Sequence, residues 1–249
     1  MNRHNLHTIN ADGVVRHAQV SFTGYSIEAA ARSIYSELLD KEGLRPSSVS
    51  GIVATGYGRN SVPFAGRAVT EIQCHATGAS HLDPAVRAVI DIGGQDSKAI
   101  VLNAAGRVTN FVMNDKCAAG TGRFLEVMAR ALEVDLDRFG SLSLQADRPA
   151  QISNLCAVFA ESEVISLIAR GEKRENIIAG IHEAIGSRVA AMAGRAGIGA
   201  ATSLMMTGGV AKNMGVVKAL EKTLGLPIAV SPLAQMTGAI GAACLARRP

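Results

Sequence analysis

Two cysteines, Cys117 and Cys156, carry the most reactive type of side chain in this sequence. Cys117 lies in the stretch Asn114–Glu126 (NDKCAAGTGRFLE), ahead of a Gly-Thr-Gly turn. Each cysteine precedes a predicted helix start, where the partial positive charge of the helix favours a thiolate or a negatively charged cluster. Spacing alone leaves three roles open for Cys117: a nucleophile, a metal ligand or a small buried apolar residue.

Either chemical role needs further groups. A nucleophile needs a general base, and the only histidine beyond His81 is His182, which lies within a predicted helix. A metal site built from cysteines needs four ligands, so two cysteines are too few in one chain, although a symmetric homodimer would supply four. The other two cysteines, Cys74 and Cys244, are interpreted as buried thiols, and no pair of cysteines forms a CxxC motif.

Two glycine pairs each follow a predicted strand. Val89–Asp96 (VIDIGGQD) is apolar up to Asp91 and then turns, and Met205–Asn213 (MMTGGVAKN) repeats the order of strand, glycine pair and helix. Glycines let the backbone approach a ligand closely. A carboxylate beside an amide-rich turn suits Mg²⁺ held through water, with phosphate oxygens on the amides. Adenine or ribose can lie against the second turn. Taken singly, each pattern also fits a tight strand–helix connection.

The composition limits the function classes. The chain has 249 residues, of which 48% are hydrophobic, enough for one large or two small domains with a real core. The net charge is +4, but Lys and Arg are scattered among Asp and Glu and aromatic residues are only 4%, so we expect no nucleic-acid partner. The sequence has neither a signal-peptide pattern nor an apolar run near the ~20 residues that cross a bilayer. We therefore expect a cytoplasmic protein with no membrane partner.

Strands and helices are expected to alternate, which is typical of an α/β fold. Strand–turn–strand units are predicted at Thr8–Val15 and Lys98–Met113, and further strands at Gly51–Gly56, Val86–Ile92, Ser203–Thr207 and Pro227–Val230. Helices are predicted at Ser26–Leu39, with Ser26 as the N-cap, from Thr121, from Glu161 to Gly171, at Asn176–Ala193, between Gly209 and Leu224, and at Thr237–Ala246. Two domains are expected: residues 1–84 joined by 232–249, and residues 85–231.

Seven motifs in order make the pattern specific. They are ATGYGRNS (Ala54–Ser61), VIDIGGQD (Val89–Asp96), NDKCAAGTGRFLE (Asn114–Glu126), FAESEVIS (Phe159–Ser166), IIAGIH (Ile177–His182), MTGGVAKN (Met206–Asn213) and SPLAQ (Ser231–Gln235). This order closely resembles the activator component of (R)-2-hydroxyacyl-CoA dehydratases. That family of CoA-substrate-specific activases also includes ATPase subunits of benzoyl-CoA reductase. The resemblance covers nearly the whole chain, from about Thr8 to Ala246.

The resemblance implies an actin/Hsp70/sugar-kinase-type fold, with two RNase-H-like domains and ATP or ADP with Mg²⁺ in the cleft. It also implies a homodimer that shares one 4Fe–4S cluster and uses ATP to drive a low-potential electron from ferredoxin or flavodoxin into a dehydratase or reductase partner. By motif, the cluster ligands would be Cys117 and Cys156, and the catalytic residues Asp91 and Gln95. The implied nucleotide-binding residues are Gly93, Gly94, Gly120, Thr121, Gly122, Gly208, Gly209 and Gln235.

The sequence departs from the family at one point, because no Asp-x-Gly hairpin of the first phosphate motif precedes Thr8. We therefore expect the first strand of domain I to be missing, through a gene start assigned too late, and ATP turnover to be weak in the chain as written. Two other functions remain open. One is a small-molecule kinase on the same fold, which would have no need of the two cysteines. The other is a non-catalytic nucleotide sensor or assembly protein.

Overall fold

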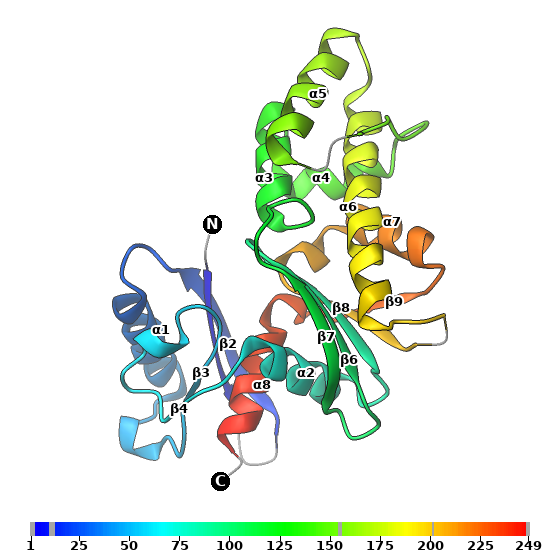
Figure 1. Cartoon of the computed structure of the whole chain (residues 1–249). Coiled ribbons are helices and arrows are strands. Elements are labelled where there is room, and N and C mark those ends of the chain that lie inside the picture. Colours follow the sequence, from blue (N-terminus) through cyan, green and yellow to red (C-terminus); the bar gives the residue numbers. More distant parts are fainter. Residues whose placement is uncertain (1–2, 10–12, 154–155, 201, 248–249) are drawn as a thin grey trace. The chain divides into compact units, whose positions relative to one another are not determined.

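The structure, a computed structural model, divides into two compact units (Figure 1). Unit 1 comprises Met1–Val86, Leu102–Val108 and Met236–Pro249, and unit 2 comprises Arg87–Val101 and Thr109–Gln235. Each unit therefore draws on segments that are far apart in the sequence. The structure describes residues 3–9, 13–153, 156–200 and 202–247.

Unit 1 contains two small sheets and three α-helices among its described residues. Its elements are β1 (Arg3–Ile9), β2 (Val15–Phe22), α1 (Ile27–Glu42), η1 (Pro46–Ser48), β3 (Val53–Ala54), η2 (Arg59–Ser61), β4 (Arg67–Ala68), α2 (Glu71–Leu82) and α8 (Thr237–Ala246). β1 and β2 pair antiparallel, as the predicted hairpin requires, and β3 and β4 pair parallel. The predicted cap of α1 is confirmed, because the Ser26 hydroxyl accepts a hydrogen bond from the amide of Ala29 at 3.2 Å.

Helices α2 and α8 cross so closely that glycine is needed at the contact. A Cβ atom on Gly78 would lie 2.0 Å from the carbonyl oxygen of Thr237, and one on Gly241 would lie 1.8 Å from that of Cys74. Any side chain at either position would force the helices apart. Cys74 is fully buried beside this contact, as expected, and burial raises the pKa of its thiol. Cys244 is only half-buried, so the prediction of a buried thiol is not met there.

Unit 2 is built on a mixed sheet. Its elements are β5 (Ala88–Ile92), β6 (Ser97–Leu102), β7 (Val108–Asn114), α3 (Gly122–Ala131), α4 (Leu136–Ser143), α5 (Ala157–Ala169), α6 (Arg174–Ala196), β8 (Leu204–Thr207), η3 (Gly209–Lys212), α7 (Met214–Leu224), β9 (Ile228–Val230) and η4 (Ala234–Met236). The strand order is β7-β6-β5-β8-β9; β5 runs antiparallel to β6 and parallel to β8. The carboxyl ends of β5 and β8 therefore meet at one edge, which is where ligands bind in open α/β sheets.

Every residue of β5 and β8 is buried, and the hydrophobic core of unit 2 continues from these strands into α3 and α6. Phe124 of α3 and Ile181 of α6 are among its fully enclosed side chains. A core on this scale can hold polar groups in fixed positions at its edge. Within the part of the chain that the structure describes, no helix is both long and apolar enough to cross a membrane.

Candidate nucleotide and cluster sites

The glycine pair after β5 forms a tight turn. The amide of Gly93 donates to the carbonyl oxygen of Asp96 at 2.9 Å, which closes the turn, and Gly94 and Gln95 are exposed at its tip. Gln95, predicted to be catalytic, is thus accessible to a ligand. We call Gly93–Asp96 the phosphate turn, because an exposed glycine such as Gly94 at the end of a buried strand lets phosphate oxygens approach the backbone.

Asp91, the predicted catalytic carboxylate, is buried and held from both sides. Its Oδ1 accepts a hydrogen bond from the Thr207 hydroxyl at 2.9 Å, and its Oδ2 lies 3.2 Å from the ammonium of Lys98. Lys98 also contacts Asp96 at 2.6 Å. We did not predict Asp96, Lys98 or Thr207 as site residues from the sequence. Lys98 and Thr207 could have been found only from the strand register, because they are the residues paired with Asp91 on the two neighbouring strands.

The second glycine pair lies against the same strand end. Gly208 has a φ of +87°, and a Cβ atom there would lie 2.3 Å from the carbonyl oxygen of Ile92 and 2.8 Å from Oδ1 of Asp91. Only glycine fits this position. The amide of Gly208 donates to the carbonyl oxygen of Ala234 at 2.9 Å, which brings the neighbouring Gln235 to this turn. Residues predicted from two separate nucleotide motifs are therefore adjacent in unit 2.

The predicted Gly-Thr-Gly residues are joined to the phosphate turn. The amides of Gly122 and Arg123 donate to the carbonyl oxygens of Gly93 and Gly94, both at 2.8 Å. The first turn of a helix has amides without partners inside the helix, and here the phosphate turn supplies two acceptors for α3. Buried Thr121 directs its hydroxyl to the carbonyl oxygen of Ala118 at 2.6 Å. These amides thus hold α3 against the phosphate turn, so a nucleotide would have to be contacted through other atoms.

Cys117 lies in a loop that one side chain organises. The side-chain amide of Asn114 donates to the carbonyl oxygens of Cys117 at 2.8 Å and Ala119 at 3.2 Å. Its oxygen accepts from the amide of Cys117 at 3.3 Å. Cys117 is half-buried against the core of unit 2. The loop between β7 and α3 therefore holds this thiol in a defined position.

Cys156 occupies the N-cap position of α5 and is exposed. Ser153, which precedes it in the chain, is held by Glu163. The two carboxylate oxygens of Glu163 each accept from the Ser153 amide at 3.0 Å, and one also accepts from the Ser153 hydroxyl at 2.8 Å. α5 begins at Ala157, earlier than the Glu161 start predicted from the sequence. α3 and α5 pack against each other (Figure 1). Both helices that follow the candidate cysteines thus belong to one packed group.

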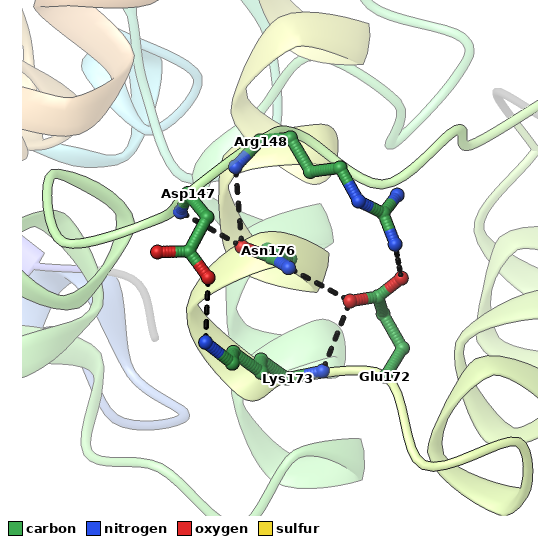
Figure 2. A network of polar contacts seen from close by, with 5 residues as sticks. All are labelled: Asp147, Arg148, Glu172, Lys173 and Asn176. Carbon is green, nitrogen blue, oxygen red and sulfur yellow. Dashed lines mark hydrogen bonds and ion pairs between the residues drawn. The ribbon is translucent and has the colours of Figure 1, made fainter.

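Asp147 and Arg148, which precede Cys156 in the chain, are fixed to the start of α6 (Figure 2). The side-chain oxygen of Asn176 accepts from the amides of Asp147 at 3.1 Å and Arg148 at 3.4 Å, and its amide donates to Glu172 at 2.7 Å. Glu172 in turn pairs with the Arg148 guanidinium at 2.7 Å, and Lys173 pairs with Asp147 at 2.5 Å. These five residues anchor the chain shortly before the Cys156 segment to the first turn of a long buried helix.

His182 is a structural residue beside the start of α7. It is fully buried, and its burial lowers the pKa from 6.5 to about 3, so its ring is neutral near pH 7. Its Nε2 lies 3.2 Å from the side-chain amide of Asn213, whose oxygen caps α7 by accepting from Val216. The cap fixes which end of the Asn213 amide faces the ring, so Nε2 accepts and Nδ1 carries the proton. His182 therefore supports α7 and is not a base for Cys117.

The chemistry of the donor set is consistent with one half of a cluster site. Among the described residues, no three His, Cys, Asp or Glu side chains gather into a metal-binding group. Two cysteines near helix starts are half of a four-cysteine set. A surface hollow of about 420 Å³ in unit 1, lined by Tyr25–Glu28, Asn60, Ser61 and Pro63, contains none of the predicted site residues.

A sequence model of the BadF/BadG/BcrA/BcrD ATPase family matches residues 11–246. The chain belongs to this ATPase family. It is 50% identical over 224 residues to the (R)-2-hydroxyglutaryl-CoA dehydratase activating ATPase of Acidaminococcus fermentans, covering 90% of this chain and 85% of the relative. It is 38% identical over 219 residues to a benzoyl-CoA reductase subunit of Thauera aromatica, covering 86% and 77%.

Solved structures show the same fold. The activator of the 2-hydroxyisocaproyl-CoA dehydratase from Clostridium difficile, with bound ADPNP, superposes with a TM-score of 0.89 at 41% identity, covering 96% of this chain and 88% of that one. A ROK family glucokinase from Streptomyces griseus superposes with a TM-score of 0.55 at 14% identity, covering 97% and 95%. The second likeness concerns the fold alone. The actin/Hsp70/sugar-kinase-type fold predicted from the sequence is confirmed.

Proposed function

We propose that this ATPase is an activator that uses nucleotide binding and hydrolysis to drive electron transfer. It would take a low-potential electron from ferredoxin or flavodoxin and deliver it to a 2-hydroxyacyl-CoA dehydratase or benzoyl-CoA reductase type of partner. Cys117 and Cys156 of two copies would together hold one 4Fe–4S cluster. When bound, such a cluster supplies one-electron chemistry at low potential.

The observation that carries this proposal is the direct joint between the nucleotide motifs and the cysteine-bearing segment. The phosphate turn accepts the first two amides of α3, and Cys117 lies in the loop that leads into that helix. A shift of the phosphate turn on nucleotide binding would therefore move the start of α3 with it. Because Asn114 fixes the Cys117 loop, that movement would reach the thiol through two sets of hydrogen bonds.

The nucleotide end of the site combines three features. The phosphate turn exposes Gly94 and Gln95, and the buried Asp91 carboxylate lies at the base of that turn. Gly208 and Gln235 lie at the adjoining turn. Carboxylates with amide-rich turns suit Mg²⁺, which keeps several waters and is bound together with phosphate. We infer that Asp91 acts on the magnesium–phosphate group through water, and that Gln95 orients the attacking water.

The dimer is supported by the surface of α5. In the single chain this helix exposes the large apolar side chains of Phe159, Ile165 and Ile168. Exposed apolar side chains in such number on one helix favour association with another protein surface. Cys156 is exposed at the start of the same helix, so a second copy docked along α5 would bring a second pair of thiols to the first.

Anaerobic purification followed by metal analysis tests the proposal. We expect a brown dimer with about four irons per dimer. Cys117→Ala and Cys156→Ala should each abolish the bound iron, whereas Cys244→Ala should retain it. A colourless monomer, or a Cys117→Ala protein with unchanged iron, would contradict the cluster assignment. Phosphoryl transfer to a small-molecule hydroxyl would instead favour the kinase.

A further inference from the structure

A row of three polar side chains crosses the centre of the unit 2 sheet. Asp91 of β5 is paired with Lys98 of β6 on one side and Thr207 of β8 on the other. Paired positions on neighbouring strands place their side chains on the same face. The contacts of 3.2 Å from Asp91 to Lys98 and 2.9 Å to Thr207 join the three side chains into one row. Each of these three residues is at most 2% exposed.

Asp96 extends this row from the end of the phosphate turn. Its Oδ1 lies 2.6 Å from the Lys98 ammonium, and its backbone oxygen accepts the Gly93 amide that closes the turn. The residue is 5% exposed. Its second carboxylate oxygen, Oδ2, is buried and has no hydrogen-bond partner among the described residues. A buried carboxylate oxygen without a donor is costly, so this atom is suited to accept a hydrogen bond from a bound group.

The charges in the row indicate which kind of bound group would donate a hydrogen bond to Asp96 Oδ2. Two carboxylates face one ammonium, so the buried set of Asp91, Asp96 and Lys98 carries an excess of one negative charge. A nucleotide phosphate alone would be repelled by it. A magnesium–nucleotide complex instead brings a divalent cation whose retained waters donate hydrogen bonds. Such a complex would supply the donor that Asp96 Oδ2 lacks and would bring a positive charge beside the two carboxylates.

We propose that Asp96 binds the water shell of nucleotide-bound magnesium through Oδ2, and that Lys98 is a positioning residue for both carboxylates. This inference rests on the nucleotide-binding part of the proposed function. Lys98 holds Asp91 and Asp96 at fixed distances from its ammonium, so that both carboxylates would act on the same magnesium ion. Asp96 also closes the phosphate turn, and the same residue would therefore align the amides and the metal.

Isothermal titration calorimetry with ADP, with and without Mg²⁺, tests the assignment of Asp96. Asp96→Asn keeps the shape of the side chain, the contact with Lys98 through its oxygen and the backbone acceptor. We expect the affinity for Mg²⁺–ADP to fall about 10- to 100-fold, as for other groups that hold a metal through its ligands. Binding of ADP alone should not weaken, because the substitution removes a negative charge that repels the phosphates. Asp137→Asn, the same substitution on the exposed surface of α4, should bind as the unaltered protein does.

Lys98 needs a variant that stays folded. Lys98→Met alone leaves two buried carboxylates without a cation, whereas Lys98→Met with Asp96→Asn keeps the net charge of the row. We expect the double variant to bind Mg²⁺–ADP no more tightly than Asp96→Asn, because the two residues act as one unit. Binding of Mg²⁺–ADP by Asp96→Asn or by the double variant as tightly as by the unaltered protein would overturn the inference and leave the proposed function standing. Failure of the unaltered protein to bind ADP under any condition would overturn both.

Discussion

The amide of Gly122 donates a 2.8 Å hydrogen bond to the carbonyl oxygen of Gly93, so α3 begins on the phosphate turn. The neighbouring hydrogen bond, from the Arg123 amide to the Gly94 carbonyl oxygen, has the same length. Two adjacent bonds resist rotation of α3 against the phosphate turn better than one would. Two segments that are separate in the sequence therefore form one rigid joint. Because this joint lies between the nucleotide motif and Cys117, substitutions in it test whether a change at the nucleotide motif reaches Cys117.

The first prediction concerns Gly122→Ala. The added Cβ would lie 3.2 Å from the Gly93 oxygen and 3.3 Å from the Gly94 Cα, both backbone atoms of the turn. Overpacking of this kind costs about 1–3 kcal/mol. The gain of about 1 kcal/mol from replacing glycine applies to helix interiors, whereas Gly122 is the first residue of α3 and the atoms that it would meet belong to the backbone of the turn. We expect a lower free energy of unfolding and weaker ADP binding, measured by urea denaturation and calorimetry.

Gly194→Ala in α6 is the matched control for this substitution. Nothing lies within 4 Å of the Cβ that it would add, so only the helix propensity changes. It should leave ADP binding unaltered and raise stability by up to about 1 kcal/mol. Equal stability of the two variants would show that α3 is not packed tightly on the phosphate turn.

The second prediction concerns Asn114→Asp. The substitution replaces the amide that donates to the carbonyl oxygens of Cys117 and Ala119 with a carboxylate oxygen, which repels them. Loss of two donors should cost about 1–3 kcal/mol and loosen the Cys117 loop. Amide hydrogen exchange at Cys117 should accelerate. Asn103→Asp is the control, since the Asn103 oxygen only accepts, from Ala105 and Arg107, and an Asp can do the same. Similar exchange rates in both variants would contradict a positioning role for Asn114.

The third prediction concerns the pH dependence of stability. Burial holds the pKa of His182 at about 3 in the folded protein, against 6.5 for the free side chain. The unfolded chain therefore binds one more proton between these values, and stability falls as the pH drops below about 6.5, by up to ~1.4 kcal/mol per pH unit. His182→Gln should flatten this slope between pH 6 and pH 4.

Urea denaturation at several pH values measures that slope. His81→Gln is the control, because His81 is exposed and its replacement should leave the slope as it is. A slope in His182→Gln as steep as that of the unaltered protein would show that other groups govern the acid sensitivity.

The fourth prediction concerns Glu163→Gln. The carboxylate accepts three hydrogen bonds from Ser153, and the neutral amide can keep only those that reach its single oxygen. Charge-assisted bonds are the stronger ones, so we expect a loss of about 1–2 kcal/mol and exchange of the Ser153 amide that is faster by roughly tenfold. Glu161→Gln lies on the same helix and should have no such effect. Unchanged exchange at Ser153 would mean that Glu163 does not hold the segment before Cys156.

The elements that were predicted from the sequence owe their form to local signals. Thr237–Ala246 is helical as expected, and Ser26 caps α1 as expected, because both depend on residues close in the chain. Helix α2 was missed, since its sequence lacks a strong apolar period and its glycine matters only through contact with α8. α4 was missed as well, because it is a short helix whose position depends on packing against α6 and α7.

The candidate site shows the same division. Asp91, Gly93 and Gly208 stand out in the sequence, because glycine pairs after apolar runs are local patterns. Lys98 does not, because a lysine in a strand is usually at the surface, and its burial depends on a carboxylate from each side. Only the strand register brings those groups together, and register is decided by the packing of the whole sheet.

The glycine contact between α2 and α8 also has a consequence for the order of events during synthesis. α2 leaves the ribosome long before Thr237–Ala246, yet each of these helices provides the surface on which the other packs. Unit 1 therefore cannot complete its packing until α8 has been synthesised. Most of unit 2 is encoded between α2 and α8 and can fold earlier. Such late closure leaves apolar surface of α2 uncovered for several seconds at ordinary rates of translation, which is the interval in which chaperones act.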